Sequence, residues 1–349
     1  MDAIPQTQRA AVYYRNSDVR IEDRPVPAIG PGEVLVRIRA SGICGSDVLE
    51  WYRMKKAPIV LGHEVAGEIV RLGEGVTRYT VGQRVAVSHH VPCNTCHYCL
   101  AGYHTACQTL HTTNFAPGGF CEYVRVPALQ TDRGVFPLPD GVTFEDGSFV
   151  EPLACVVRGQ RSANLRPGQA VAVLGAGISG ILHIALAKAL GAGRIVATDL
   201  SPFRLNLARR FGADAVFDAR DDVPARVREA NGGRPADLVV VCAGALAAFK
   251  QALASVDRGG TILCFATTDP GVELPVPLND FWRNDVTLKP SYGNSPHDAA
   301  VALALIAAGR VPVADMITHR LPLAETPRGF QLMSTPGGEH LKVVILPHG

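Results

Sequence analysis

The sequence has no excess of charge of either sign and no long apolar run. Its 349 residues carry 34 Lys and Arg against 32 Asp and Glu, which gives a formal net charge of +2. A balance of this kind provides no electrostatic basis for binding nucleic acid or a membrane surface. The longest apolar segment, residues 178–190, is interrupted by Ser179, Gly180, His183 and Lys188, and it is too short and too polar to span a bilayer. We therefore expect neither a nucleic-acid partner nor a membrane partner.

A secretory signal is also missing, because residues 1–9 lack the charged and apolar regions of such signals. Nine cysteines would indicate a disulfide framework only in a short secreted chain. Five of them are scattered among apolar neighbours, which suits a reducing compartment: Cys44, Cys121, Cys155, Cys242 and Cys264. These features predict a cytoplasmic protein.

The sequence shows two different patterns of apolar residues along the chain, and its length favours about two domains. From about residue 8 to residue 128, short β-branched stretches alternate with Gly and Pro, as at residues 34–39, 59–61, 68–70 and 84–87. This pattern is typical of a β-rich or barrel-like module. From about residue 169, apolar strands alternate with helix-length segments over roughly 120 residues, which indicates βαβ units and a parallel sheet.

Four cysteines within fifteen residues form a C-x2-C-x2-C-x7-C pattern: Cys93, Cys96, Cys99 and Cys107. Four thiolates can converge on one tetrahedral zinc ion at zinc–sulfur distances of about 2.3 Å, and they leave no coordination position open. Such a closed site stabilises structure and performs no chemistry. The final gap of seven residues departs from the bacterial two-cluster ferredoxin run. We predict a structural zinc in a lobe at about residues 89–112, with an iron–sulfur site or paired disulfides as alternatives.

A nucleotide-binding signature follows the predicted strand at residues 171–174. Gly175, Gly177 and Gly180 form a G-x-G-x-x-G at the start of an apolar helix. The first glycine permits a tight turn, the second lets the backbone approach a pyrophosphate, and the third allows close helix–strand packing. Asp199 ends the next strand, where a carboxylate can accept hydrogen bonds from the ribose hydroxyls. Because an acid there repels a 2′-phosphate, NAD is favoured over NADP.

Other residues near this turn complete the predicted cofactor site. They lie in the first helical turn, just after Asp199, and after a later strand of the parallel sheet: Ile178, Ser179, Leu200, Arg204, Cys242 and Ala243. Arg204 could soften the preference for NAD, but its place in a helical first turn predicts a solvated side chain. The alternative is a glycine-rich turn without a ligand.

Upstream segments suggest a second metal site. Cys44 lies in Gly-Ile-Cys-Gly-Ser-Asp, and His63 and Glu64 lie in Gly-His-Glu about twenty residues later. These segments, the four-cysteine lobe, Glu151 in Val-Glu-Pro-Leu-Ala and the glycine-rich turn follow the order and spacing of the zinc-dependent medium-chain dehydrogenases. The chain resembles that family over essentially its whole length. It is most similar to the polyol and sugar dehydrogenase branch, typified by sorbitol dehydrogenase and L-idonate 5-dehydrogenase.

The resemblance implies an α/β fold with two domains. A GroES-like β-rich catalytic domain would comprise residues 1–155 and 295–349, and a doubly wound Rossmann domain would bind NAD at residues 156–294. Substrate and nicotinamide would meet in the cleft between the domains. The resemblance also implies a homodimer or a homotetramer.

Individual roles follow from the same resemblance. Cys44 and His63 would bind a catalytic zinc, Glu64 would be a direct or exchangeable ligand, and Glu151 would face the metal directly or through water. Zinc would act as a Lewis acid on a substrate hydroxyl, whose proton Ser46 would pass on. NAD would accept the hydride. The expected reaction is oxidation of a secondary alcohol of a polyol, sugar, sugar acid or cyclitol to the ketone.

Two positions depart from the family pattern. Leu49 stands where branch members often carry a relay histidine, which leaves water, the cofactor ribose or Glu151 as proton routes. Ser291 replaces an arginine that precedes the tyrosine of a substrate-binding pair, so the substrate is expected to be less polar, differently oriented or cyclic. The candidate pocket walls are Phe120, Tyr292 and residues 50–54.

Two further groups of residues invite a functional reading. Five histidines surround the cysteine lobe, and we expect them to be loop residues without a metal of their own: His89, His90, His97, His104 and His111. Lys342 follows a glycine-rich turn and is a candidate phosphate contact.

Two rival functions remain open at this stage. One is an amino-alcohol enzyme similar to L-threonine 3-dehydrogenase, against which we count Leu49 and the lack of an obvious arginine for a substrate carboxylate. The other is a non-catalytic, zinc-stabilised NAD sensor, which would need a disabled second metal site.

Overall fold

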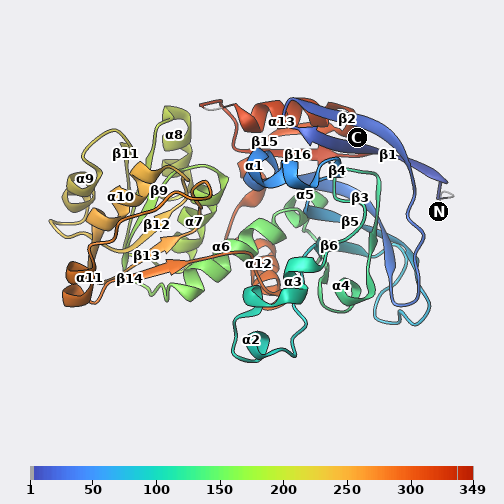
Figure 1. Ribbon diagram of the computed structural model, residues 1–349, viewed down its shortest axis with the longest axis horizontal. Helices are drawn as coiled ribbons and strands as arrows, with labels where there is room; N and C mark the ends of the chain where they lie inside the picture. Colours follow the sequence, from blue (N-terminus) through green and yellow to red (C-terminus); the bar gives the residue numbers. More distant parts are fainter. Residues whose placement is uncertain (1–3, 336, 349) are drawn as a thin grey trace. The chain divides into compact units, whose positions relative to one another are not determined.

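The computed structural model describes residues 4–335 and 337–348, and its contacts divide the chain into two compact units (Figure 1). Unit 1 comprises Met1–Ala154, Asn294–Gly309 and Val313–Gly349, and unit 2 comprises Cys155–Gly293 and Arg310–Pro312. The predicted domain bounds, residues 1–155 with 295–349 and residues 156–294, stay predictions.

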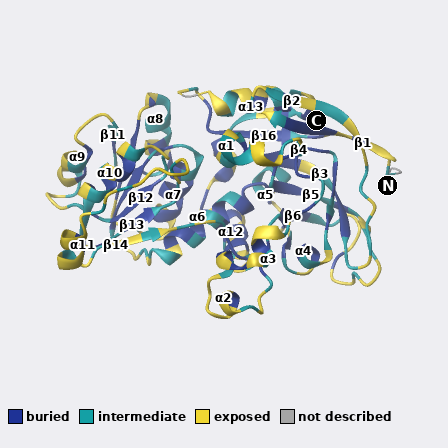
Figure 2. Cartoon of the chain, viewed as in Figure 1, coloured by how far each residue is buried: buried dark blue, intermediate teal, exposed yellow. Residues whose placement is uncertain are grey.

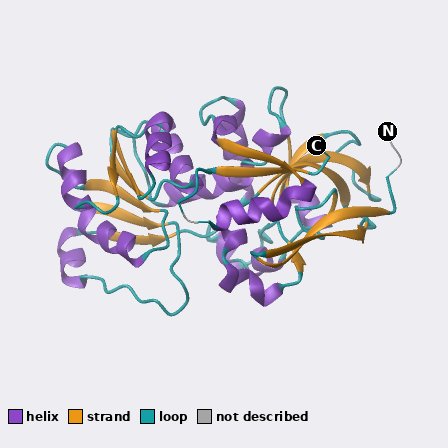
Figure 3. Cartoon of the chain, turned by 90° about the horizontal axis from the view of Figure 1, so that it is seen from above, coloured by secondary structure: helices purple, strands orange, loops and turns teal. Residues whose placement is uncertain are grey.

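Two sheets form the framework of unit 1 (Figure 3). The smaller sheet is antiparallel, in the order β2 (Asp18–Pro25), β1 (Thr7–Arg15) and β4 (Ile59–Val60). The larger sheet has the order β15 (Ile317–Pro322), β16 (Lys342–Leu346), β3 (Val34–Gly42), β5 (Glu64–Leu72), β6 (Arg84–Ser88) and β8 (Val135–Pro137), and β7 (Tyr123–Val126) also pairs with β3. The four stretches predicted as strands lie in β3, β4, β5 and β6, so those predictions are confirmed.

The core of unit 1 contains buried residues from both sheets, including β1, β3, β5 and β16, and Figure 2 colours these strands as buried. Val36 and Ile38 of β3 are fully buried on either side of the half-buried Arg37. Phe120 and Phe330 meet edge to face, with ring centroids 5.8 Å apart. Each such side chain contributes about 1.5–3 kcal/mol by leaving water, which fixes the strand ends that carry the site.

Short helices connect the strands of unit 1. The segment between β3 and β4 contains η1 (Gly45–Val48), α1 (Glu50–Arg53) and η2 (Met54–Lys56). The cysteine lobe contains α2 (His97–Leu100), η3 (His104–Ala106) and α3 (Gln108–Thr112). The remaining short elements are α4 (Ala128–Arg133), α5 (Phe144–Gly147), η4 (Val313–Met316) and η5 (Leu323–Glu325), and longer helices are α12 (Pro296–Ala307) and α13 (Thr326–Ser334). Helix α6 (Val150–Ser162) begins in unit 1 and continues into unit 2.

Unit 2 is a parallel six-stranded sheet, as the alternating pattern predicts. Its strand order is β11 (Ala215–Asp218), β10 (Arg194–Asp199), β9 (Ala170–Leu174), β12 (Ala236–Val241), β13 (Val256–Cys264) and β14 (Thr287–Pro290). The connecting helices are α7 (Ile178–Ala189), α8 (Pro202–Phe211), α9 (Val223–Ala230), α10 (Leu246–Ser255) and α11 (Leu278–Asn284).

The centre of this sheet reads as apolar runs because both of its faces are covered. Val239, Val240 and Val241 of β12 are fully buried between β9 and β13. The order of strands reverses between β9 and β12, and ligands of doubly wound sheets bind outside the carboxyl ends of the strands at such a reversal. Among the described residues, no helix combines the length and the apolar character needed to cross a bilayer.

Candidate metal centres and cofactor site

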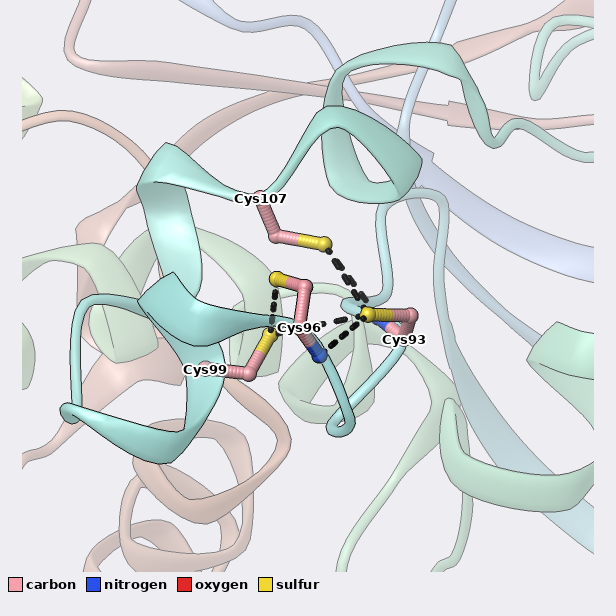
Figure 4. Close-up of side chains that lie close together, drawn as sticks. All are labelled: Cys93, Cys96, Cys99 and Cys107. Atoms are coloured by element: carbon pink, nitrogen blue, oxygen red, sulfur yellow. Dashed lines mark hydrogen bonds between the residues drawn. The ribbon is translucent and has the colours of Figure 1, made fainter.

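The four-cysteine lobe brings its sulfur atoms together (Figure 4). The Sγ–Sγ distances are 3.9 Å for Cys93 and Cys99, 3.6 Å for Cys96 and Cys99, and 3.6 Å for Cys93 and Cys107. A regular tetrahedron of sulfurs around zinc at 2.3 Å has edges of about 3.8 Å. Since a disulfide needs about 2.05 Å, the spacing fits a zinc ion and does not fit paired disulfides.

Hydrogen bonds from backbone N–H groups favour the thiolate form of Cys93. Sγ of Cys93 accepts hydrogen bonds from the N–H groups of Thr95 at 3.5 Å and Cys96 at 3.3 Å. These bonds, with Thr95 the largest cause, lower the pKa of Cys93 to about 5. Burial instead raises the pKa of Cys99 to about 12, a thiol that a bound zinc would deprotonate.

A second ligand group forms where β3 ends and β5 begins. Cys44, His63 and Glu64 place one ligand atom each within 4.8 Å of one another. Cys44 is the N-cap of η1, where its Sγ accepts the N–H of Ser46 at 3.4 Å, and Asp47 accepts the N–H of Cys44 at 3.1 Å. This reciprocal arrangement corresponds to a capping box, so the local sequence itself turns the thiol to the end of the sheet.

Asp47 fixes the imidazole of the group. Its Oδ1 lies 3.3 Å from Nδ1 of His63, and the Asp47 side chain is fully buried. Burial by itself raises the pKa of Asp47, but the charges of His63 and Arg53 and their hydrogen bonds lower it below its usual value. Burial lowers the pKa of His63, and the negative charges of Asp47 and Cys44 raise it well above its usual value. With Nδ1 facing Asp47, Nε2 is the nitrogen that can bind a metal.

Arg53 is a site residue that sequence reasoning named only as part of a pocket wall. Its Nε donates to the carbonyl oxygen of Ser46 and its Nη2 donates to Oγ of Ser46, both at 2.9 Å. Nη2 also lies 3.2 Å from Oδ1 of Asp47. Oγ of Ser46 is in turn 3.4 Å from Sγ of Cys44. The sequence signal was an arginine seven residues after the predicted relay serine, and nothing in the spacing showed that it folds back.

The prediction that Lys342 contacts a phosphate is wrong, because the structure pairs this lysine with Glu64. Its side chain is fully buried in β16, where Nζ forms an ion pair with Oε2 of Glu64 and donates to the carbonyl oxygen of Ile43 at 3.2 Å. A Cβ at Gly42 would collide with both members of this pair, so glycine is required there. The ion pair neutralises the Glu64 carboxylate beside Cys44 and His63.

Glu151 lies outside the group of mutually close ligand atoms. It is mostly buried in the first turn of α6, and its Oε1 accepts a hydrogen bond from Nδ2 of Asn294 at 3.3 Å. A metal contact of Glu151 therefore stays a prediction. Leu49 precedes α1, is 37% exposed and offers no group that could carry a proton.

Two of the five predicted loop histidines lie beside the metal group, which sequence reasoning missed. The ring of His89 is centred 4.7 Å from that of His63 and 3.8 Å from that of His90. Burial lowers the pKa of His90 to about 3 and that of His89 well below its usual value, and nearby positive charges lower both further. Both rings are therefore neutral near pH 7. His97, His104 and His111 lie in the helices of the cysteine lobe.

The predicted pocket walls are placed differently from one another. Phe120 is fully buried in the core of unit 1, as apolar packing of the β-module explains, and its contact with substrate stays a prediction. Trp51 and Tyr52 of α1 are half-buried, with ring centroids 5.7 Å apart. Tyr292 of unit 2 is 50% exposed, and its contact with substrate stays a prediction.

The glycine-rich turn of unit 2 has the geometry of a phosphate-binding turn. Gly175 has a φ of +99° at the end of β9, and a Cβ at Gly180 would collide with the carbonyl oxygen of Gly175. A Cβ at Gly177 would meet no described atom within 4 Å. Gly177 is the N-cap of α7, and half-buried Ile178 and Ser179 form its first turn. This open face at a helix N-terminus fits a pyrophosphate.

Asp199 is held beside this turn. Its Oδ2 accepts the N–H of Ala176 at 2.8 Å and its Oδ1 accepts the N–H of Ser201 at 2.9 Å. The carboxylate is thereby fixed at the end of β10 with lone pairs left for ribose hydroxyls. Leu200 is 60% exposed. Arg204 is half-buried, which corrects the expectation of a solvated side chain, because α8 packs back on β10 and β11.

Cys242 and Ala243 follow β12 on the other side of the strand reversal. The N–H of Cys242 donates to the carbonyl oxygen of Leu174 at 2.8 Å, and burial raises the pKa of the Cys242 thiol. The amide nitrogen of Ala243 lies 3.1 Å from where a Cβ on Gly175 would be. These two residues thus border the turn, and their predicted contact with a cofactor stays a prediction.

Two family models match the chain, one in each part of the sequence. Residues 30–140 match the alcohol dehydrogenase GroES-like domain, and residues 179–308 match the zinc-binding dehydrogenase domain.

Curated relatives match over nearly their full lengths. A sorbitol dehydrogenase of Gallus gallus is 33% identical over 348 residues, which cover 96% of this chain and 95% of the relative. An L-threonine 3-dehydrogenase of Rhizobium etli (strain CIAT 652) is 34% identical over 333 residues, which cover 93% of this chain and 94% of the relative.

Solved structures share the architecture of the chain. An alcohol dehydrogenase from Thermus sp. ATN1 superposes with a TM-score of 0.87 at 32% identity, covering 97% of this chain and 99% of that one. An NADP-bound protein of Sinorhizobium meliloti 1021 superposes with a TM-score of 0.88 at 28% identity, covering 98% and 100%. The predicted combination of a GroES-like domain and a Rossmann domain is confirmed by these matches.

Proposed function

Because the chain belongs to the zinc-binding dehydrogenases with an alcohol dehydrogenase GroES-like domain, we propose that it oxidises a secondary alcohol of a polyol, sugar, sugar acid or cyclitol to the ketone, with NAD as the hydride acceptor. Sorbitol dehydrogenases and D-xylulose reductases among its relatives support this substrate class. The observation that carries the proposal is the Cys44, His63 and Glu64 group, which offers a thiolate, an imidazole and a carboxylate within 4.8 Å of one another.

These residues fit a catalytic zinc, since three protein ligands leave a fourth position open. Bound there, zinc would supply the Lewis acidity that lowers the pKa of a substrate hydroxyl. Asp47 holds His63 in the tautomer that presents Nε2. Lys342 holds the Glu64 carboxylate and reduces its charge, which would favour a ligand that binds and leaves over a permanent one. We retain Glu151 as a residue facing the metal directly or through water.

Ser46 is the residue that we propose to receive the substrate proton. Its Oγ lies 3.4 Å from Sγ of Cys44, one of the residues that would hold the zinc, and Nη2 of Arg53 donates a hydrogen bond to that oxygen at 2.9 Å. Because Leu49 carries no proton acceptor, the onward route is water, the cofactor ribose or Glu151. The Arg53 guanidinium offers N–H donors and no acceptor, so it orients Ser46 and does not take the proton itself.

In unit 2, we propose that Gly175, Gly177 and Gly180 bind the pyrophosphate of NAD and that Asp199 binds the ribose hydroxyls. When bound, NAD supplies the nicotinamide that accepts a hydride, a step that requires it to reach the alcohol carbon. The half-buried Arg204 lies in the first turn of α8, five residues after Asp199, and is a candidate cofactor contact. The Asp199 carboxylate favours NAD, although one similar protein is bound to NADP.

We further propose a structural zinc on Cys93, Cys96, Cys99 and Cys107, where the sulfur spacing supports it. A homodimer or homotetramer and residence in the cytoplasm complete the proposal. All nine cysteines are free thiols, which agrees with a reducing compartment.

The two rival functions have specific support and specific gaps. An amino-alcohol enzyme is supported by the L-threonine 3-dehydrogenase relatives, and Arg53 removes the earlier objection that no arginine lies near the site. A non-catalytic sensor would need a disabled metal group, whereas Cys44, His63 and Glu64 lie together. One zinc per chain, tight NAD binding and no turnover would favour the sensor.

The test is a screen of the zinc-loaded protein for NADH formation with polyols, aldonic acids, inositols and threonine. We expect turnover with at least one hydroxylated substrate and two zinc ions per chain. Cys44→Ser should retain NADH binding and lose roughly 1000-fold or more in kcat/KM together with one zinc.

Cys264→Ser is the matched control, since this half-buried thiol belongs to neither cysteine group. It should keep both zinc ions and its turnover. Full turnover by Cys44→Ser with only the lobe zinc present would contradict the proposed function.

A further inference from the structure

Arg53 has donors left over after its contacts inside unit 1. Its Nε and Nη2 make three hydrogen bonds, to the carbonyl oxygen and Oγ of Ser46 and to Oδ1 of Asp47. A guanidinium has five N–H groups, of which two belong to Nη1. Within the described part of the chain, no hydrogen bond to Nη1 is formed. The side chain is 14% exposed, so this end of the guanidinium is rigidly held and open to a ligand.

A second cation lies next to Arg53. Cζ of Arg53 is 4.7 Å from the ring centroid of Tyr52, and Nζ of Lys56 is 6.0 Å from the same centroid. Lys56 is exposed and makes no ion pair among the described residues. Burial and then nearby positive charges, among them Lys56 and Arg53, lower the pKa of His90, whose ring centroid lies 3.8 Å from that of His89 beside His63. Arg53 and Lys56 thus both lie near the ring of Tyr52, and Arg53 also contacts Ser46 beside Cys44.

The carboxylates of the same segments are already engaged. Asp47 is fully buried between Arg53 and His63. Glu64 is paired with Lys342 inside the sheet. Glu50 is exposed and its Oε1 accepts the backbone N–H of Asn16 at 2.8 Å. The charged side chain that contacts Oγ of Ser46 is thus the cation Arg53.

We propose that Arg53 and Lys56 bind an anionic group of the substrate, so that the alcohol oxidised here belongs to a hydroxy acid, such as a sugar acid, and not to a neutral polyol. This inference rests on the proposed function and narrows its substrate class. Nη1 of Arg53 has two N–H donors, and each can give a charge-assisted hydrogen bond to a carboxylate oxygen. Ser46 forms hydrogen bonds with both Arg53 and Cys44. An anion bound to Arg53 would therefore be held close to Ser46, the residue proposed to receive the proton of the reacting hydroxyl.

The same charges disfavour an amino alcohol. A substrate such as threonine carries an ammonium group next to its carboxylate, and a like charge beside Arg53 and Lys56 opposes its binding. The proposal therefore separates hydroxy acids both from neutral alcohols and from amino acids.

Three matched alcohols test the proposal, because each presents the same CH(OH)CH3 group: butane-2,3-diol is neutral, 3-hydroxybutanoate is an anion and threonine is a zwitterion. Gluconate and sorbitol form a second pair. We compare wild type with Arg53→Lys and Arg53→Gln. Since charge-assisted hydrogen bonds are lost, kcat/KM of Arg53→Gln should fall about 10- to 100-fold further for the anions than for the neutral partners.

The loss with neutral substrates measures the separate effect of Arg53 on Ser46 and Asp47. Arg53→Lys keeps the charge and loses the planar guanidinium with its N–H donors. Its additional loss of kcat/KM for anions over neutral substrates should therefore lie between that of wild type and that of Arg53→Gln. Lys56→Gln should show a smaller selective loss. Lys55→Gln is the matched control, since this exposed neighbouring lysine forms no hydrogen bond or ion pair with a described residue, and it should not change the ratio of acid to neutral substrate. Equal losses for acids and neutral alcohols in Arg53→Gln would overturn the proposal.

A binding experiment keeps the test independent of turnover. Trp51 precedes Tyr52, whose ring Arg53 overlies, so its fluorescence reports on this segment. Gluconate should quench or shift this emission in wild type and bind at least 10-fold more weakly to Arg53→Gln, whereas sorbitol should not distinguish the two proteins. Equal gluconate affinity, or no gluconate binding by wild type, would overturn the proposal.

A titration with NADH separates a substrate anion from the cofactor diphosphate. If Arg53→Gln weakens NADH binding and leaves gluconate binding unchanged, Arg53 serves the cofactor and the proposal is wrong. Failure of the proposed function looks different: wild type would bind zinc, NADH and gluconate and oxidise none of the alcohols.

Discussion

Oδ1 of Asp47 lies 3.3 Å from Nδ1 of His63, and this contact joins a fully buried carboxylate to the imidazole of the predicted catalytic zinc group. Because the Asp47 carboxylate also accepts a hydrogen bond from the backbone N–H of Cys44, one side chain orients two of the three ligands. A carboxylate behind a metal-binding histidine fixes the tautomer and raises the basicity of the ring.

Asp47→Asn should therefore weaken zinc binding at this group by about 10- to 100-fold, because the amide keeps the shape and loses the charge. The check is a competition titration with a chelator, which counts the weaker of the two zinc ions. Asp18→Asn is the control, since Asp18 forms an ion pair with the exposed Arg20 at 2.7 Å and belongs to neither group of predicted metal ligands. Unchanged zinc affinity in Asp47→Asn would refute the orienting role.

The buried pair of Lys342 and Glu64 predicts a large asymmetric effect on stability. Lys342→Met leaves a carboxylate buried without its cation, which should lower the free energy of unfolding by about 3–5 kcal/mol. The double variant Lys342→Met with Glu64→Gln should recover part of this loss, because no buried charge remains. Urea denaturation of the protein measures both.

The matched control for this pair is exposed. Arg320 contacts Glu145 at 2.8 Å with side chains 48% and 28% exposed, so Arg320→Met should cost less than about 1 kcal/mol. If Lys342→Met is no less stable than Arg320→Met, then the carboxylate finds another partner and our account of Glu64 is wrong.

Substitution by alanine should affect a different property at each of two glycines, stability at Gly180 and NADH binding at Gly177. Gly180→Ala places a Cβ against the carbonyl oxygen of Gly175 and should lower the free energy of unfolding by about 1–3 kcal/mol. Gly177→Ala meets open space in the protein, so its stability should stay within about 0.5 kcal/mol of wild type. Its NADH affinity should fall about 10-fold or more, because the new methyl group takes the space of the pyrophosphate. Thermal unfolding and NADH fluorescence separate the two; normal NADH affinity in Gly177→Ala would argue against this turn as the cofactor site.

His183 predicts a pH dependence of stability in unit 2. Nδ1 lies 3.2 Å from Nε2 of Gln160, the ring packs on Phe265, and burial lowers the pKa of His183 to about 3. Folded His183 is thus neutral, while the unfolded chain takes up a proton below about pH 6.5. Its contribution is fully present above pH 6.5 and is lost as the pH falls toward 3, at about 1.4 kcal/mol per pH unit.

His183→Leu should remove about that slope between pH 6.5 and 5.5, as measured by urea denaturation at each pH. His297→Leu is the control, because the exposed His297 already meets solvent. An identical slope in wild type and His183→Leu would show that His183 is protonated in the folded state.

Cys107→Ser tests the lobe by itself. Loss of one thiolate opens the tetrahedral site, so the protein should hold one zinc in place of two and lose more than about 3 kcal/mol of stability. Elemental analysis gives the zinc count and denaturation gives the stability. Two retained zinc ions with unchanged stability would contradict a structural zinc at the four cysteines.

The sequence by itself determined the features that depend on neighbours along the chain. The parallel sheet followed from strands alternating with helices, the glycine-rich turn followed from three glycines after β9, and the lobe followed from four cysteines within fifteen residues. Local spacing constrains such groups strongly, since few backbone paths exist between residues so close together.

Only the tertiary structure decided the contacts between distant residues and the direction of each side chain. It pairs Lys342 with Glu64 across the sheet, folds Arg53 back on Ser46, sets His89 against His63 and buries Phe120 in the core. Each of these depends on strand register and on packing against elements far away in sequence, where a shift of one residue would turn the side chain to the opposite face. The residue types were therefore visible in advance, but the partners that give them their chemistry were not.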